Sequence, residues 1–363
     1  MTRANASVLT DARTLQLESF PVPDEIGADE ALLAVEANGM CGSDWSQYEG
    51  ELAKLAPFPV VPGHETVGRL ERVGDQAAKR WGVSQGARVA VESIAPCGAC
   101  PNCRGGRPRL CLQGVIYGFT PVASTPSLSG GFAEYMVLRP RSLVYPLPEH
   151  LSTEDAVMFN PLGAGFDWAI RAAGTQLGDN VLILGPGQRG LCSVVAAHEA
   201  GAGRVIVAGR GRRPWKLRLA EKLGATHVID TDKTTLEDAI RDITDGAGVD
   251  RAIDTTPGAI EPLRAAIHAL RPEGTLVLGG LKHGADLPEI DDHVIRKALT
   301  VKGVAMVSEW GKEQAIRVLG TGRYDFSEFH THTIPLGELD RAMRILGGEV
   351  DGEEAMHITV VPG

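Results

Sequence analysis

One segment, Val181-Leu-Ile-Leu-Gly185-Pro-Gly187-Gln-Arg-Gly190-Leu-Cys-Ser-Val-Val, sets the architecture of the chain. Its first four residues are apolar, which is typical of a buried strand in a parallel sheet. Three glycines follow at the spacing G-x-G-x-x-G, and apolar residues then recur at helical intervals. Gly185 permits a tight turn, Gly187 leaves room for a pyrophosphate, and Gly190 lets the helix pack closely on the strand. The segment therefore predicts a strand–turn–helix unit that binds a dinucleotide at the helix N-terminus.

The predicted pattern of secondary structure changes along the chain, at about Pro148. From about Pro148 onward, apolar strands alternate with helical patterns, as in a doubly wound parallel sheet. Residues 1–150 instead hold short strands that end in glycine or proline turns. The strands expected in the two parts are Leu32–Val35, Val67–Val73, Arg88–Val91, Val181–Leu184, Val205–Ala208, His227–Ile229, Arg251–Asp254 and Thr275–Leu278. A last strand, His357–Val361, is expected to return to the β-rich part.

The overall composition excludes some classes of function. The chain has 363 residues and a net charge of −10, with a pI of about 5.5, which argues against nucleic acid and anionic membranes as partners. It has no apolar run of the roughly eighteen residues that a membrane span needs. The first residues lead into Val8 and Leu9 without the apolar stretch of a signal peptide, so a cytoplasmic protein is expected.

Four of the six cysteines lie close together in the sequence. Cys97, Cys100, Cys103 and Cys111 follow the pattern C-x2-C-x2-C-x7-C. In a reducing compartment such spacing favours a metal over disulfides. Four thiolates close a tetrahedral zinc site with no open position, which makes the site structural. An iron–sulfur cluster is the alternative metal interpretation.

A second set of candidate ligands lies before the cysteine cluster. Cys41 opens the run Cys41-Gly-Ser43-Asp44, and His64 is followed by Glu65. Cysteine and histidine together suit zinc, although each alone is more often a residue of the core. Asp44 is the natural acceptor for the second ring nitrogen of His64, which would fix the ring.

These motifs, in this order and together with Gly130-Gly-Phe-Ala-Glu-Tyr, resemble the zinc-containing medium-chain alcohol dehydrogenase family. The resemblance implies an α/β fold with a GroES-like β-rich catalytic domain (1–153 and 298–363). That domain carries a cysteine lobe at 93–113 and is split by a Rossmann doubly wound parallel-sheet domain (154–297). It also implies a structural and a catalytic zinc. Cys41 and His64 would bind the catalytic zinc with Glu65 on or near it, and Ser43 would accept the alcohol proton.

The chain departs from the family pattern at three positions. Asn160 stands where Glu or Cys is usual as a third zinc ligand, and Ser46 stands where histidine is common. We therefore expect Cys41, His64 and Glu65 as resting ligands, with Asn160 nearby. Asn160 could alternatively cap a helix that opens at Pro161. The resemblance places a helix start near Asn160, and the glycines of that helix are expected to face the nicotinamide.

The third departure concerns the choice of cofactor. Gly209 ends the second strand of the Rossmann pattern, where an acid would bind the ribose 2′-hydroxyl of NAD. Arg210, Arg212 and Arg213 follow and could pair with a 2′-phosphate. The sequence therefore favours NADP over NAD, the alternative being a solvated basic loop. An aspartate placed at Gly209 is expected to shift the preference toward NAD.

The expected activity is hydride transfer between an alcohol, secondary or aromatic/alicyclic, and NAD(P)⁺, which gives a ketone or aldehyde. Candidates for an apolar substrate pocket are Trp45, Tyr48, Phe119 and Trp168, although each such residue is more often part of a core. A homodimer or homotetramer is expected. Two rival functions stay open: a redox-neutral zinc-assisted lyase or hydratase, and a non-catalytic nucleotide sensor that keeps only the structural zinc.

Overall fold

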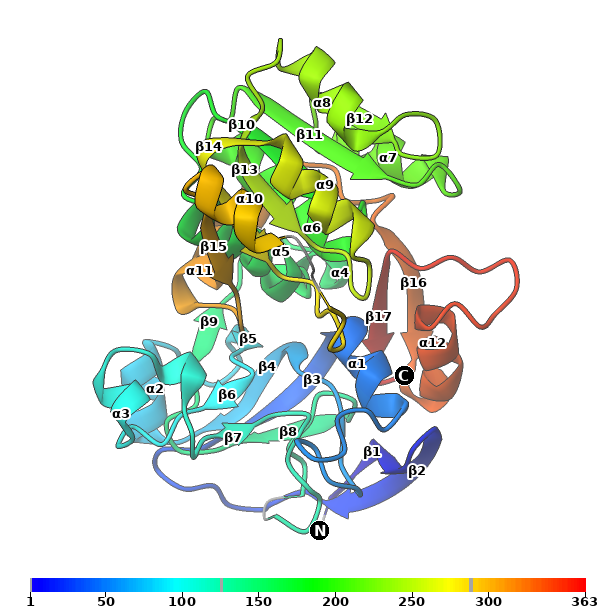
Figure 1. Cartoon of the computed structure of the whole chain (residues 1–363). Helices are drawn as coiled ribbons and strands as arrows, with labels where there is room; N and C mark the ends of the chain where they lie inside the picture. Colours follow the sequence, from blue (N-terminus) through cyan, green and yellow to red (C-terminus); the bar gives the residue numbers. More distant parts are fainter. Residues whose placement is uncertain (1, 125–126, 287–289) are drawn as a thin grey trace. The chain divides into compact units, whose positions relative to one another are not determined.

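A computed structural model describes residues 2–124, 127–286 and 290–363, and it divides the chain into two compact units (Figure 1). The first unit holds residues 1–159, 318–321 and 326–363, and the second holds residues 160–317 and 322–325. The domain boundaries expected at 153/154 and 297/298 lie earlier in the chain than these. None of the helices in the described residues is long and apolar enough to span a membrane.

The second unit is built on a six-stranded sheet in the order β12-β11-β10-β13-β14-β15, and all its neighbouring strands run parallel. This confirms the doubly wound parallel sheet that the sequence predicts. The edge strand β15 was not predicted, because its four residues are exposed and carry no apolar pattern. The strands are β10 (Asn180–Leu184), β11 (Arg204–Gly209), β12 (His227–Asp230), β13 (Val249–Asp254), β14 (Leu270–Leu278) and β15 (Thr300–Gly303).

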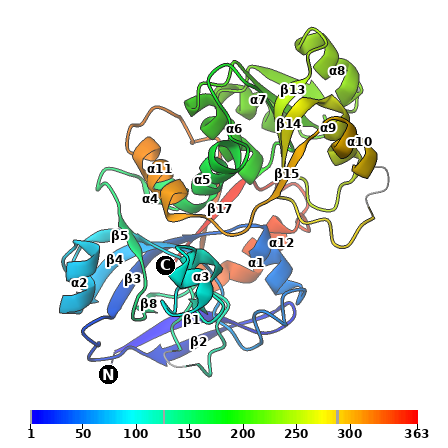
Figure 2. The ribbon, with the colours of Figure 1, turned by 60° about the vertical axis from the view of Figure 1, so that its left-hand side comes forward.

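Helices cover both faces of this sheet (Figure 2). The face that carries Leu182, Ile206 and Leu276 packs against α8 (Leu236–Ile243), α9 (Glu261–Ala269) and α10 (Ile290–Arg296). Alternate strand residues point the other way, where α6 and α7 contact the strands. The remaining helices of this unit are α6 (Gln188–Glu199), α7 (Pro214–Lys222), α5 (Phe159–Phe166), which continues as a π-helical segment (Asp167–Ala172), and α11 (Glu309–Leu319).

The first unit is organised around a sheet in the order β16-β17-β3-β4-β5-β9, with β8 also paired to β3. The last strand of the chain, β17, pairs antiparallel with β3, so it does return to the β-rich part. The strands of this sheet are β3 (Ala31–Gly39), β4 (Glu65–Val73), β5 (Arg88–Val91), β8 (Tyr135–Leu138), β9 (Val144–Pro146), β16 (His330–Pro335) and β17 (His357–Val361).

Smaller elements surround this sheet. A hairpin, β1 (Arg3–Asp11) and β2 (Thr14–Pro21), opens the chain, and a two-stranded ribbon, β6 (Ile94–Ala95) and β7 (Val115–Ile116), flanks the cysteine lobe. The helices of this unit are α1 (Gly42–Tyr48), α2 (Asp75–Trp81), α3 (Pro101–Arg104), α4 (Thr153–Ala156) and α12 (Leu339–Leu346).

Candidate metal and cofactor sites

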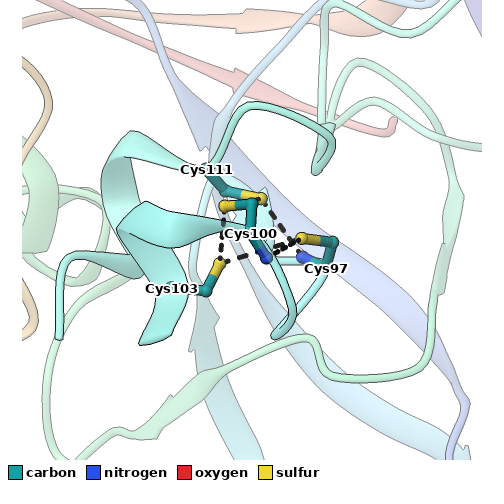
Figure 3. Close-up of side chains that lie close together, drawn as sticks. All are labelled: Cys97, Cys100, Cys103 and Cys111. Atoms are coloured by element: carbon teal, nitrogen blue, oxygen red, sulfur yellow. Dashed lines mark hydrogen bonds between the residues drawn. The ribbon is translucent and has the colours of Figure 1, made fainter. Parts of the chain in front are cut away.

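The structure brings the four clustered cysteines together, with their sulfur atoms facing one another (Figure 3). The Cys103 Sγ atom lies 3.9 Å from the Sγ atom of Cys97 and 3.5 Å from that of Cys100. The Sγ atoms of Cys100 and Cys111 are 3.9 Å apart. Four sulfurs at about 2.3 Å from a tetrahedral zinc are separated by roughly 3.8 Å. The donor set and its spacing therefore fit a closed, structural zinc site.

Backbone amides in the cysteine lobe favour the thiolate forms of Cys97 and Cys100, which bind cations. The N–H groups of Ala99 and Cys100 point at the Cys97 sulfur, 3.4 and 3.3 Å away, and they lower the pKa of that thiol. Backbone amides at Leu112 and Cys103 lower the pKa of Cys100 to about 6. Burial, together with the neighbouring thiols, raises the pKa of Cys103 to about 12. A cation at the centre would favour the thiolate form of all four.

Cys41, Ser43, Asp44 and His64 form a second group, which we call the Cys41–His64 group. Cys41 directly precedes α1, and its backbone N–H donates to Asp44 Oδ2 at 2.9 Å, which fixes the first turn. His64 directly precedes β4 and follows Gly63, whose φ of +94° lies in the left-handed region that favours glycine. A Cβ atom on Gly63 would lie 2.7 Å from the backbone nitrogen of Phe132. The Gly130-Gly131-Phe132 turn thus packs against the segment that presents His64.

The geometry of this group suits a zinc ion. His64 Nε2 lies 3.3 Å from Cys41 Sγ, while a sulfur and a nitrogen ligand of one tetrahedral zinc are about 3.6 Å apart. The other ring nitrogen, Nδ1, lies 3.3 Å from Asp44 Oδ1, as the sequence predicts. Burial alone would lower the pKa of His64, but the charges of Asp44 and Cys41 outweigh it and raise that pKa well above its usual value. The pocket is thus electrostatically prepared for a cation.

The structure does not bring Glu65 to this group. The ligand atoms that gather there belong to Cys41, Asp44 and His64. Glu65 begins β4 and is paired with Gly39 of β3, and its carboxylate lies on that side, 2.9 Å from where a Cβ of Gly39 would be. Consecutive residues of an extended chain point to opposite faces. The expected resting ligation by Glu65 is therefore not seen in this conformation.

Asn160 lies within the second unit and is buried. Helix α5 begins at Phe159, one residue earlier, so Asn160 does not occupy the capping position that the sequence suggested as an alternative. Its backbone carbonyl accepts a hydrogen bond from the Arg189 side chain, in the first turn of α6, at 3.1 Å. A role for its side chain on the metal stays a prediction.

The glycines of α5 serve helix packing. A Cβ on Gly165 would lie 2.3 Å from the carbonyl oxygen of Cys192 in α6, and one on Gly163 would lie 3.1 Å from the backbone of Lys312 in α11. These glycines thus allow two neighbouring helices to approach α5 closely, and the expectation that they face the nicotinamide stays a prediction.

The aromatic candidates for a substrate pocket separate into different environments. Tyr48 is buried and donates a 2.6 Å hydrogen bond to Asp340, and Trp45 packs against the same core. The Trp168 ring packs against Gly279 at the end of β14. The Phe119 ring centroid lies 5.5 Å from that of His64, so Phe119 adjoins the metal group.

A cavity of about 880 Å³ opens at the carboxyl ends of the strands in the second unit. Gly185, with φ +95°, makes the turn, and a Cβ on Gly187 would have no neighbour within 4 Å. A Cβ on Gly190 would lie 1.9 Å from the carbonyl oxygen of Gly185, so this helix packs tightly on the turn. These are the three roles of a dinucleotide-binding turn.

Basic side chains gather on one wall of this cavity. Arg210, Arg212 and Arg213 line it, as the sequence suggested, and Lys216 of α7 joins them. Asp232 also lines the cavity, and its carboxylate accepts a 2.9 Å hydrogen bond from the Gly211 N–H, which holds the basic loop. Sequence reasoning missed Lys216 and Asp232, although Asp232 follows strand β12 at the edge where such cavities form.

Two threonines that also line this cavity were missed as well. Thr255 and Thr256 follow Asp254, the fully buried last residue of β13. Lys282 lies 2.6 Å from the Asp254 carboxylate and donates to the carbonyl of Ala259 at 2.9 Å. This buried ion pair ties the loop that lines the cavity to the loop after β14. Polar residues directly after a buried strand were the available signal.

With these sites described, comparison with known proteins identifies the family. Residues 27–149 match the alcohol dehydrogenase GroES-like domain, and residues 190–320 match the zinc-binding dehydrogenase domain. A probable alcohol dehydrogenase of Mycobacterium tuberculosis is 41% identical over 365 residues, which cover 98% of each chain. The chain belongs to the zinc-containing medium-chain alcohol dehydrogenase family.

Other members of this dehydrogenase family agree in sequence and in fold. An erythritol/L-threitol dehydrogenase of Mycolicibacterium smegmatis is 33% identical, over 96% of this chain and 94% of its own. The crystal structure of a zinc-binding dehydrogenase from Sinorhizobium meliloti 1021, bound to NADP, has a TM-score of 0.85 and 28% identity, with all of both chains covered. The chain is thus a zinc-dependent oxidoreductase that uses NAD(P) and acts on a small alcohol.

Proposed function

We propose that the protein oxidises a secondary alcohol to a ketone with NADP⁺, and catalyses the reverse reaction. The observation that carries this proposal is the Cys41–His64 group, in which a thiol and an imidazole face one point beside a serine hydroxyl. The choice of a secondary alcohol is supported by a relative that is named as an L-threonine 3-dehydrogenase, because the 3-hydroxyl of threonine is secondary. Phe119 would contribute an apolar contact for the carbon chain.

The residues of the group would divide the work as follows. Cys41 and His64 would hold the zinc, which when bound supplies Lewis acidity toward the alcohol oxygen. Asp44 would fix the imidazole so that Nε2 faces the metal. Ser43 Oγ, 2.9 Å from Cys41 Sγ and 3.3 Å from His64 Nε2, would accept the hydroxyl proton. Ser46 offers no ring nitrogen, so hydroxyls and water would carry the proton outward.

The proposed preference for NADP is supported by the basic wall of the cavity. Four cationic side chains, Arg210, Arg212, Arg213 and Lys216, line it around Gly209, and a relative of known structure is bound to NADP. Arg210→Ala is expected to weaken NADP⁺ binding about tenfold, which is roughly one charge-assisted contact, while NAD⁺ binding stays nearly constant. Equal losses for both cofactors would count against a 2′-phosphate contact at Arg210.

The remaining catalytic ligand is also a proposal. Asn160 occupies the position where the family usually places Glu or Cys, and its amide oxygen would leave the metal more positive than a carboxylate would. Glu65 could bind the metal in place of Asn160 only if the Glu65 side chain turned away from Gly39. We expect Asn160→Glu to hold zinc more tightly than wild type in competition with a chelator, and unchanged retention would argue against Asn160.

The assembly and the location of the protein are proposed on separate observations. All four residues of the edge strand β15 are exposed, and Val301 and Met306 add apolar surface there, which supports a homodimer or homotetramer. Five of the six cysteines belong to the two candidate metal groups, and cysteines used for metal binding support a reducing cytoplasm. Light scattering of the purified protein measures its oligomeric state.

A panel of substrates tests the proposed reaction. Secondary, benzylic and polyol alcohols are offered with NADP⁺ and with NAD⁺, and reduced cofactor and carbonyl product are both measured. We expect equimolar ketone and NADPH from a secondary alcohol. Product formed without a change in cofactor would support the lyase or hydratase alternative, and a protein that binds cofactor without turnover would support the sensor alternative.

A further inference from the structure

Gly209 lies against the proline of the glycine-rich turn. A Cβ atom on Gly209 would lie 2.5 Å from Cδ and 2.8 Å from Cγ of Pro186, while its next neighbour, Leu217 Cδ2, is at 3.6 Å. The backbone of Gly209 is not in the left-handed region. The ring of Pro186 is therefore what prevents a side chain at this position.

Pro186 is not free to move aside. The Gly185 N–H donates to the carbonyl of Ala208 at 2.8 Å, which ties the turn to the end of β11. The Gly185 carbonyl accepts from Thr255 Oγ1 at 3.2 Å and is closely covered by Gly190. The ring fixes the backbone φ of Pro186, and the proline side chain has no flexible terminal group that could rotate away. Relief of the contact would therefore have to disturb the turn that receives the pyrophosphate.

The contact lies on the wall of the cofactor cavity. Pro186, Gly209 and Arg210 all line it. In dinucleotide-binding folds the residue at the end of the second strand supplies the carboxylate that binds the ribose 2′-hydroxyl and repels a 2′-phosphate. The first atom of any such side chain would overlap the proline ring.

We infer that Pro186 and Gly209 act as one specificity unit, in which the proline ring prevents a carboxylate side chain at position 209, the end of the second strand. This inference rests on the proposed preference for NADP. It corrects the expectation that aspartate at Gly209 alone shifts the preference toward NAD, because that residue has no space until the Cγ and Cδ atoms of Pro186 are removed. Alanine at Pro186 removes both atoms.

A double-mutant cycle tests this coupling. Wild type, Pro186→Ala, Gly209→Asp and the double variant are compared by calorimetric titration with NADP⁺ and NAD⁺ and by the Tm of the cofactor-free protein. We expect Gly209→Asp alone to lower the Tm and to weaken both cofactors. The double variant should recover the Tm and shift the ratio of the two affinities toward NAD⁺ by about tenfold or more relative to Gly209→Asp.

Two further variants keep the outcome clear. Pro257→Ala removes another proline that lines the cavity and should not rescue Gly209→Asp. Gly209→Ala, with and without Pro186→Ala, repeats the cycle with the Cβ atom alone if the aspartate variant does not fold. A Gly209→Asp protein with wild-type Tm and the same shift toward NAD⁺ as the double variant would overturn the inference. Tighter binding of NAD⁺ than NADP⁺ by wild type would instead refute the NADP proposal. The double-mutant cycle would still measure the coupling between positions 186 and 209.

Discussion

Ser43 is the residue with the most direct role in proton transfer, since its hydroxyl touches both Cys41 Sγ and His64 Nε2. We expect Ser43→Ala to lower kcat by about a hundredfold, the typical loss when acid–base assistance is removed. Cofactor affinity, measured by titration in the absence of alcohol, should be unchanged. Ser84→Ala, which alters an exposed serine of the same unit, is the control. A near-normal kcat for Ser43→Ala at neutral pH would show that water alone accepts the proton.

For single residues, the sequence predicts side-chain contacts that depend on neighbours close in the chain. Asp44 follows Cys41 by three residues, within one helical turn, so its contact with Cys41 could be predicted. Its contact with His64 could be predicted because a zinc-binding histidine needs an acceptor for its second ring nitrogen. The direction of the Glu65 side chain could not, because it depends on the pairing of Glu65 with Gly39 across two strands. The contact between Pro186 and Gly209 could not be predicted either, since it joins the turn after β10 to the last residue of β11.

Among the elements, the cysteine lobe depends most on a bound ion. Cys103→Ser should leave three thiols around the zinc position, lower the zinc content by one ion per chain and lower the Tm. Cys192→Ser, which changes the one cysteine outside both metal groups, should keep the full zinc content. Unchanged zinc and Tm in the Cys103→Ser protein would contradict a structural zinc in the lobe.

The loop after β13 depends on the Asp254–Lys282 ion pair. Lys282→Met would leave a fully buried carboxylate without its cation, which we expect to cost about 3–5 kcal/mol of unfolding free energy in denaturant titration. Cofactor affinity should fall as well, because Thr255 and Thr256 on that loop line the cavity. Asp254→Asn in the same chain should recover part of the stability.

A second lysine gives the matched control for this variant. Lys297 is also partly buried, and its ammonium group donates to the carbonyls of His268 and Leu270, both at 2.6 Å. Lys297→Met should lower stability and leave cofactor affinity unchanged. Equal losses of affinity in the two methionine variants would mean that the loop after β13 is not held by Lys282.

Strands were predictable where burial on both faces made them apolar, as in Val181–Leu184 and Val205–Ala208. Strand β15 escaped because it is an exposed edge, and the π-helical segment Asp167–Ala172 escaped because its pattern matches an ordinary helix. That segment is stabilised by tertiary bonds, since the Ser308 hydroxyl donates to Asp167 at 2.6 Å.

For the whole molecule, the order of the motifs was sufficient to predict the family and the two-unit organisation. The boundaries were less predictable, because most of α11 belongs to the second unit although it follows the last strand of the parallel sheet. Its residue Gly311 packs against Gly163 of α5, a close contact between helices that are distant in the sequence. Such contacts leave no periodic signal in the sequence.

The function proposed for the whole molecule requires that the Cys41–His64 group carry a second, catalytic zinc. Its most direct test is the zinc content of the purified chain, measured by mass spectrometry on wild type, Cys41→Ser and Cys103→Ser. We expect two zinc ions in wild type and one in each variant. Cys41→Ser should be inactive in alcohol oxidation but still fold and bind NADP⁺. A Cys41→Ser protein that keeps two zinc ions and full activity would contradict the claim.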